Sequence, residues 1–201
     1  MPNWKIHLEV AKRVNDIIKY DDKSYNEFMI GNILPDINNC YLVKDISSKI
    51  PHSSTHFYPV HHEGFYEKYK NFFDNPVVVG YYTHLYTDYL WNSDFYSKFK
   101  NVNNLSDDDV RILKQKDFKI YNNDFVNNTI KIYDLDELIR KISIIDEVSI
   151  IKQDIINVCE YLDKKVIFDE GNYSFYNKCN LDCLLDYTVE NIKNKKLKIN
   201  G

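Results

Sequence analysis

The sequence is poor in the residues that make turns. It has 5 glycines and 5 prolines in 201 residues, which favours helices over a turn-rich β fold. Long apolar runs are also missing, because no stretch approaches the roughly 18 residues that can span a bilayer. At this length, one domain with a substantial core is expected.

A strong charge of either sign is absent too. The formal net charge is -4, so nothing draws the whole protein towards nucleic acid or an anionic membrane. The first five residues, Met-Pro-Asn-Trp-Lys, contain no apolar segment of the kind found in secretory signals. We therefore expect a cytoplasmic location.

Cysteine is scarce, and its spacing is uninformative. Of the four cysteines, Cys40 and Cys159 stand alone, while Cys179 and Cys183 are four residues apart. No second pair or nearby histidine completes a zinc-finger spacing. We therefore interpret the cysteines as free thiols that face the core, in preference to ligands of a soft metal.

Apolar residues recur at intervals of three and four along most of the chain, which is typical of amphipathic helices. Asn3 and Ser106 are suited to cap two of them, and the basic tail 194–200 is expected to fray. The pattern predicts one all-α domain over residues 1–201, with seven to nine helices. The expected helices cover residues 4–20, 24–30, 63–73, 77–92, 107–115, 134 or 136–142, 146 or 149–162, and 180–193.

Residues 80–91 read as a buried helix with two polar exceptions, His84 and Asp88. Four residues apart, these side chains lie about 40° from each other around the helix, one turn apart. They are either a buried hydrogen-bonded pair or two ligands of one metal ion.

Three other polar residues of the N-terminal half interrupt or follow apolar segments. His7 lies on the apolar face of the first helix, where a lone histidine is usually a core residue. Asp36 follows Gly-Asn-Ile-Leu-Pro, a sequence that favours a helix end, so it is either an N-cap or an inward-pointing ligand. His56 lies in an irregular loop that carries several histidines.

All 6 histidines fall within the first 84 residues. We expect His61 and His62 to lie in a solvated turn. The five residues discussed above, three histidines and two aspartates, are expected to face inward. Three imidazoles and two carboxylates favour borderline divalent cations, above all zinc. A metal site is therefore predicted within residues 1–95, and its ligands are expected to be His7, Asp36, His56, His84 and Asp88.

Four motifs of this half occur in a fixed order. They are Trp4-x-x-His7, Gly31-Asn32-Ile33-Leu34-Pro35-Asp36, Ser54-Thr55-His56-Phe57 and Gly80-Tyr81-Tyr82-Thr83-His84-Leu85-Tyr86-Thr87-Asp88. In order and register they resemble the bacterial zinc-dependent phospholipase C family, which is structurally akin to the single-strand-specific zinc nucleases. The resemblance covers roughly residues 1–95, and the C-terminal half matches only in being helical.

The resemblance implies an all-α bundle in which a zinc cluster cleaves phosphodiester bonds. The ligands of one zinc would be Asp36, His56, His84 and Asp88. A second zinc would be held by His7, with Asp88 bridging the two ions. Asp36 and Asp88 would be the catalytic carboxylates.

The chain departs from the family pattern in two places. The family's third zinc is held by two histidines and a glutamate downstream, whereas no histidine follows His84 here. Asp94 and Asp124 are candidate replacements. The family's mature enzymes also use their N-terminal amine as a ligand at the tryptophan, whereas three residues precede Trp4. One or two ions are therefore expected, not three.

Two functions follow from this pattern. The first is a zinc-dependent phosphoesterase acting on a small phosphoester or a phospholipid. The alternative is a non-catalytic, metal-stabilised binding module of the same superfamily.

A phosphohydrolase of the His-Asp dyad type is disfavoured, because no histidine is followed directly by aspartate. Peptide cleavage is disfavoured because His-Glu-x-x-His is absent, and no paired carboxylates indicate glycoside cleavage.

Overall fold

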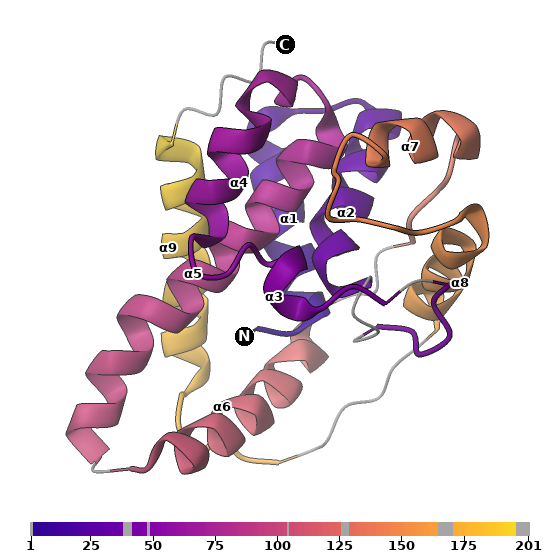
Figure 1. The fold of residues 1–201 in the computed structure, drawn as a ribbon. Helices are drawn as coiled ribbons and strands as arrows, with labels where there is room; N and C mark the ends of the chain where they lie inside the picture. The colour runs from indigo at the N-terminus through magenta and orange to yellow at the C-terminus, as the bar shows by residue number, and fades with distance from the viewer. Residues whose placement is uncertain are drawn as a thin grey trace.

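The computed structural model describes residues 2–37, 42–47, 49–103, 105–125, 129–164 and 171–195, apart from the side chains of 93–103. Within these residues the protein has nine α-helices, two short 3-10 helices and no strands, which confirms the all-α class (Figure 1). None of the helices described is both long and apolar enough to cross a membrane. The α-helices are α1 Trp4–Ile18, α2 Asp22–Ile37, α3 His52–Thr55, α4 His61–Tyr69, α5 Pro76–Asn103, α6 Asp107–Tyr121, α7 Leu135–Ile142, α8 Lys152–Asp163 and α9 Lys178–Asn194.

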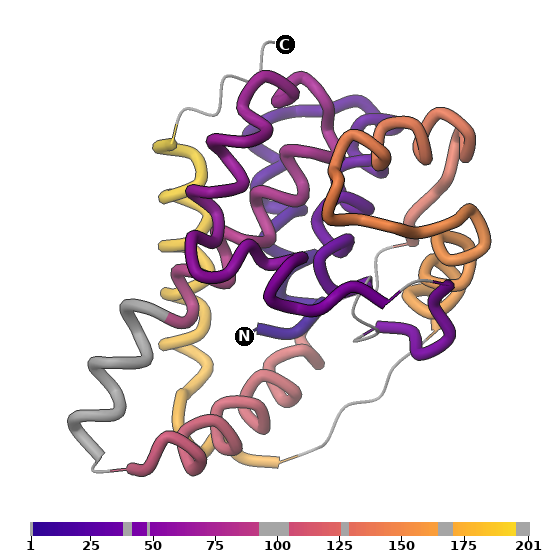
Figure 2. Tube along the Cα trace, in the orientation of Figure 1, coloured from indigo at the N-terminus to yellow at the C-terminus, as the bar shows by residue number. Residues whose placement is uncertain are grey.

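Helix α5 is the central element, and it contacts α1, α2, α4, α7 and α9. Its first half is buried on all sides, from Val77 to Trp91 with the exception of Tyr89. A helix that is apolar all round is expected to be enclosed by others. Figure 2 shows α9 on one side of this arrangement and α7 and α8 on the other.

Capping side chains set several helix starts, as their sequences predict. The Asn3 side chain accepts a hydrogen bond from the backbone N–H of Ile6 at the start of α1. Ser106 caps α6, and Asp134, one of the two expected caps, caps α7. Helix α8 begins at Lys152, later than the predicted Asp146 or Ser149.

The predicted helix end at Gly31 and Asn32 is wrong, because α2 continues through Pro35 to Ile37. The glycine serves a close helix crossing instead. A Cβ on Gly31 would lie 2.1 Å from the carbonyl oxygen of Val77, and one on Gly80 would lie 2.1 Å from that of Phe28. Only glycine lets the two backbones approach this closely.

Two other helices run further than expected. Helix α5 does not end near Asp94 but continues to Asn103, and α6 continues past Gln115 to Tyr121. Tertiary contacts extend α6, because the buried carboxylate of Asp117 accepts backbone hydrogen bonds from the segment 174–176 at 2.6–2.7 Å.

The prediction that the cysteines face the core holds only for Cys159. Cys179 and Cys183 are exposed on α9, and all three are free thiols. Cys40 and the tail beyond residue 195 lie outside the described residues.

We expect Gly31→Ala and Gly80→Ala each to lower the free energy of unfolding by about 3 kcal/mol or more, because the added methyl group meets backbone atoms that cannot move aside. The gain in helix propensity, about 1 kcal/mol, is too small to compensate. Chemical denaturation measures the change. Gly171→Ala is the matched control, since its Cβ would have no neighbour closer than 3.7 Å, and wild-type stability of Gly31→Ala would contradict the close crossing.

Candidate metal centre

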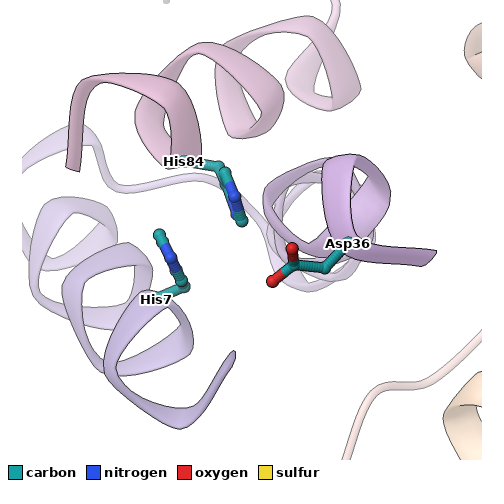
Figure 3. Close-up of side chains that lie close together, drawn as sticks. All are labelled: His7, Asp36 and His84. Carbon is teal, nitrogen blue, oxygen red and sulfur yellow. The ribbon is translucent and has the colours of Figure 1, made fainter. Parts of the chain in front are cut away.

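Four parts of the chain bring the five predicted ligand residues together. His7 comes from α1, Asp36 from the last turn of α2, His84 and Asp88 from α5, and His56 from the residue after α3. All five are buried. Figure 3 shows the side chains of His7, Asp36 and His84 pointing towards one another from three helices.

One group of ligand atoms forms a small triangle. The Nε2 atom of His56 lies 3.2 Å from Nε2 of His84 and 3.3 Å from Oδ2 of Asp88, and the third edge, from His84 Nε2 to Asp88 Oδ2, is 3.5 Å. Tetrahedral zinc with bonds of about 2.0–2.1 Å requires ligand atoms about 3.3 Å apart. The triangle therefore has the dimensions of one face of a zinc site, and Oδ1 of Asp36 lies 3.8 Å from His56 Nε2.

A second group lies on the other side of His84. Its members are His7, Asp36 and His84, and in each of the two groups the ligand atoms lie within 4.8 Å of one another. His7 stacks on the His84 ring with centroids 3.8 Å apart, and its Nε2 is 3.4 Å from Oδ1 of Asp88. Asp88 thus presents one oxygen to His7 and the other to His56 and His84.

Backbone carbonyls fix the orientation of two imidazoles. Nδ1 of His84 lies 2.7 Å from the carbonyl oxygen of Asn32, and Nδ1 of His56 lies 3.2 Å from that of His52. A carbonyl oxygen only accepts hydrogen bonds, so we assign the proton of the neutral His84 ring to Nδ1. Nδ1 of His56 also lies 3.0 Å from the Thr55 hydroxyl, which can donate or accept, and we assign the same tautomer there on the carbonyl contact. The lone pair on each Nε2 then points into the cluster, which is the arrangement that outer hydrogen bonds impose on metal-binding histidines.

The cluster contains several polar atoms without a partner. Both ring nitrogens of His7, both carboxylate oxygens of Asp88 and Oδ1 of Asp36 are buried and lack a hydrogen bond to any described residue. Buried polar atoms in folded proteins nearly always have one. A cation within reach of these lone pairs would satisfy them, so the donor set fits a metal ion.

The electrostatics of the cluster are dominated by Asp88. Burial raises the pKa of this carboxyl, but the imidazoles of His56, His7 and His84 outweigh burial and hold the pKa well below its usual range. Burial, together with the nearby His84, lowers the pKa of His7 to about 4. Near neutral pH the centre therefore contains an ionised carboxylate beside a neutral imidazole.

The cluster is almost closed to solvent. The side chains of Asp36 and Asp88 keep 11% and 9% of their surface exposed, whereas His7 and His84 keep 1%. Both oxygens of Asp88 and Oδ1 of Asp36 are themselves buried.

The remaining histidines and aspartates have other roles. Asp124 is exposed and forms an ion pair with Lys178, so it is not brought into the cluster. The side chain of Asp94 lies outside the described residues. The expected solvated turn at His61 and His62 is wrong, because both begin α4 and His62 is buried, 4.6 Å from the Tyr89 ring.

Sequence reasoning missed the groups that position the ligands. The carbonyls of Asn32 and His52 carry no sequence signal, because every residue has one. The His52 ring stacks on that of His56 at 3.7 Å, and only the four-residue spacing of these histidines could have indicated the contact. Tyr81 donates a hydrogen bond to the carbonyl of Thr55, which ties α3 to α5.

Fold and site together define an all-α protein with a buried His/Asp cluster that could hold a metal ion. Neither a family model, nor a curated protein, nor a solved structure matches the chain.

We expect zinc to bind and to raise the stability of the wild-type protein by about 2.7 kcal/mol at a free concentration one hundred times the dissociation constant. His84→Ala and Asp88→Ala should lose this gain, because each removes a ligand atom from the triangle. Thermal unfolding with and without zinc, together with elemental analysis, measures the effect.

Asp124→Ala is the matched control and should bind zinc as the wild type does. Equal zinc uptake by the wild type and by correctly folded Asp88→Ala would contradict the assignment.

Proposed function

We propose that the protein is a metal-dependent phosphoesterase that hydrolyses a phosphodiester or related phosphoester, with zinc as the metal. The observation that carries the proposal is the shared use of Asp88, whose two oxygens face two adjacent groups of histidines. A carboxylate between two metal positions suits a pair of neighbouring ions, which favours in-line displacement at phosphorus.

The residues divide into two sets of ligands. On the motif resemblance, His56, His84, Asp36 and Oδ2 of Asp88 would hold the first ion, while His7 and Oδ1 of Asp88 would hold a second. Asp36 and His84 also lie within reach of the second position, because their ligand atoms group with those of His7. One or two ions fit this donor set. All three histidines of the cluster already serve the first or the second ion, so none is left to hold a third. When bound, such ions lower the pKa of a water molecule and stabilise negative charge on phosphoryl oxygens.

The chain itself supplies positioning. The carbonyl groups of Asn32 and His52 hold the imidazoles of His84 and His56 in one orientation, so the ligands are ordered before substrate arrives. Asp36 and Asp88 lie at the more exposed side of the cluster. We assign them the catalytic role of orienting the attacking water and accepting hydrogen bonds from it.

The substrate class is a small phosphoester or the headgroup side of a phospholipid. Motif resemblance to the zinc-dependent phospholipase C family supports both, and the burial of the ligands favours a compact phosphoester. This assignment and the cytoplasmic location remain predictions.

A second function is favoured by the burial of the ligands. His7 and His84 are almost completely enclosed, and the sequence has no histidine beyond His84. A metal held in this way can stabilise a helical binding module without turning over substrate. The two functions differ in whether the metal-loaded protein hydrolyses phosphoesters.

We expect chelator-sensitive hydrolysis of at least one of bis-p-nitrophenyl phosphate, p-nitrophenylphosphorylcholine, p-nitrophenyl phosphate or single-stranded DNA, in the presence of zinc or manganese. Asp36→Asn should lower kcat/KM by more than the roughly 10- to 100-fold that the loss of an outer partner costs at metal sites. Asp124→Asn should leave kcat/KM unchanged. Absence of turnover on all four substrates, from protein shown to hold its metal, would favour the non-catalytic module instead.

A further inference from the structure

A cleft of about 470 Å³ lies between α4, α5 and the residue that follows α9. Its volume is within the range of about 300–1,000 Å³ that small-molecule sites occupy. The lining residues are His62, Glu63, Tyr66, Glu67, Tyr82 and Lys195.

The cleft is separate from the metal centre. Tyr82 and Tyr86 project about 160° around α5 from His84, so the two sites use opposite faces of one helix. The cleft therefore involves neither a metal nor phosphoester chemistry.

Tyr82 is the α5 residue that lines the cleft, and it belongs to a row of stacked tyrosines; with Lys195 in place, Tyr82 and Tyr86 are 3% and 5% exposed. Tyr82 stacks with Tyr86 at 5.9 Å, and Tyr86 stacks with Tyr89 at 6.2 Å. His62 of α4 packs on Tyr86 with ring centroids 4.7 Å apart, and Tyr66 lies 6.1 Å from Tyr82. The faces of such rings carry negative electrostatic potential and attract cations.

A cation of the chain itself already lies at this row of tyrosines. The Lys195 ammonium is 5.4 Å from the centroid of the Tyr86 ring, within the distance of a cation–π contact. Two carboxylates, Glu63 and Glu67, line the cleft from one face of α4. Glu67 pairs with Lys70, whereas Glu63 has no ion pair within the described part of the chain.

His62 makes the cleft more receptive to a cation. Burial lowers the pKa of its imidazole to about 4, so the ring is neutral near pH 7 and does not repel positive charge. It is 4% exposed, and its Nδ1 has no hydrogen-bond partner among the described residues. The cleft thus combines aromatic faces, an unpartnered buried nitrogen and two acidic groups.

We propose that this cleft binds a methylated ammonium group against Tyr66 and Tyr82, and against Tyr86 once Lys195 has moved, with Glu63 as the counter-charge. Lys195 occupies the position of the ligand until the ligand displaces it. The methylated cation is favoured over a primary ammonium because methylation lowers the free energy needed to remove the cation from water and bring it against the tyrosine rings.

The test is titration of the full-length protein with tetramethylammonium chloride at constant ionic strength, followed by backbone amide NMR. We expect saturable shifts in residues 62–67 and 82–89. Lys195→Met should bind about fivefold more tightly, and Glu63→Gln about fivefold more weakly, in line with a cation–π and charge contribution of this size. Lys193→Met, which removes an exposed lysine from the last turn of α9, should bind as the wild type does.

Neutral tert-butanol tests whether charge is recognised. Equal shifts with tert-butanol and tetramethylammonium would overturn the proposal, as would the lack of saturable shifts in folded Lys195→Met. Unchanged affinity in Lys195→Met would overturn the role of Lys195.

The cation can belong to a protein tail or to a small quaternary ammonium compound, and peptides with and without trimethyllysine distinguish these two sources. Tighter binding of the methylated peptide than of tetramethylammonium points to a protein tail, and weaker binding points to a small compound.

Discussion

The close crossing of α2 and α5 is the constraint on which the site depends. Gly31 and Gly80 bring the two backbones together where any Cβ would overlap a carbonyl group. This approach places the Asn32 carbonyl 2.7 Å from Nδ1 of His84. The Nε2 atom of His84 therefore points towards Asp36 and Asp88, and the geometry of the cluster follows from helix packing as much as from the ligands themselves.

The sequence predicted which segments are helical, and which residues form the cluster, better than it predicted where the helices begin and end. The four-residue spacing of His84 and Asp88 implies a shared face in any α-helix, and caps such as Asn3 act through local hydrogen bonds that the sequence contains. Gly31 misled the prediction because the same residue type ends helices and permits close crossings. Only the position of α5 decides between these roles, and that position depends on tertiary contacts.

Helix α5 has two faces with different chemistry. One carries His84 and Asp88 towards α1 and α2, and the other carries Tyr82 and Tyr86 towards α4 and Lys195. The difference between the two faces was not evident in the sequence. Tyrosine is abundant along the whole chain, and a helix that is apolar all round does not show which side faces which neighbour. The packing of α4 and α9 distinguishes the second face.

The charge of the buried cluster argues for a cation. Two carboxylates, Asp36 and Asp88, lie among three imidazoles, and burying net charge without compensation is costly. Burial lowers the pKa of His84, but the carboxylates of Asp88 and Asp36 outweigh burial and raise this pKa. A proton on this ring offsets one carboxylate only, and the pKa of His7 is too low for that ring to contribute near neutral pH. A divalent ion compensates both carboxylates while leaving the imidazoles neutral. A bound ion would therefore link metal binding to folding, because it would stabilise the helix crossing that forms its site.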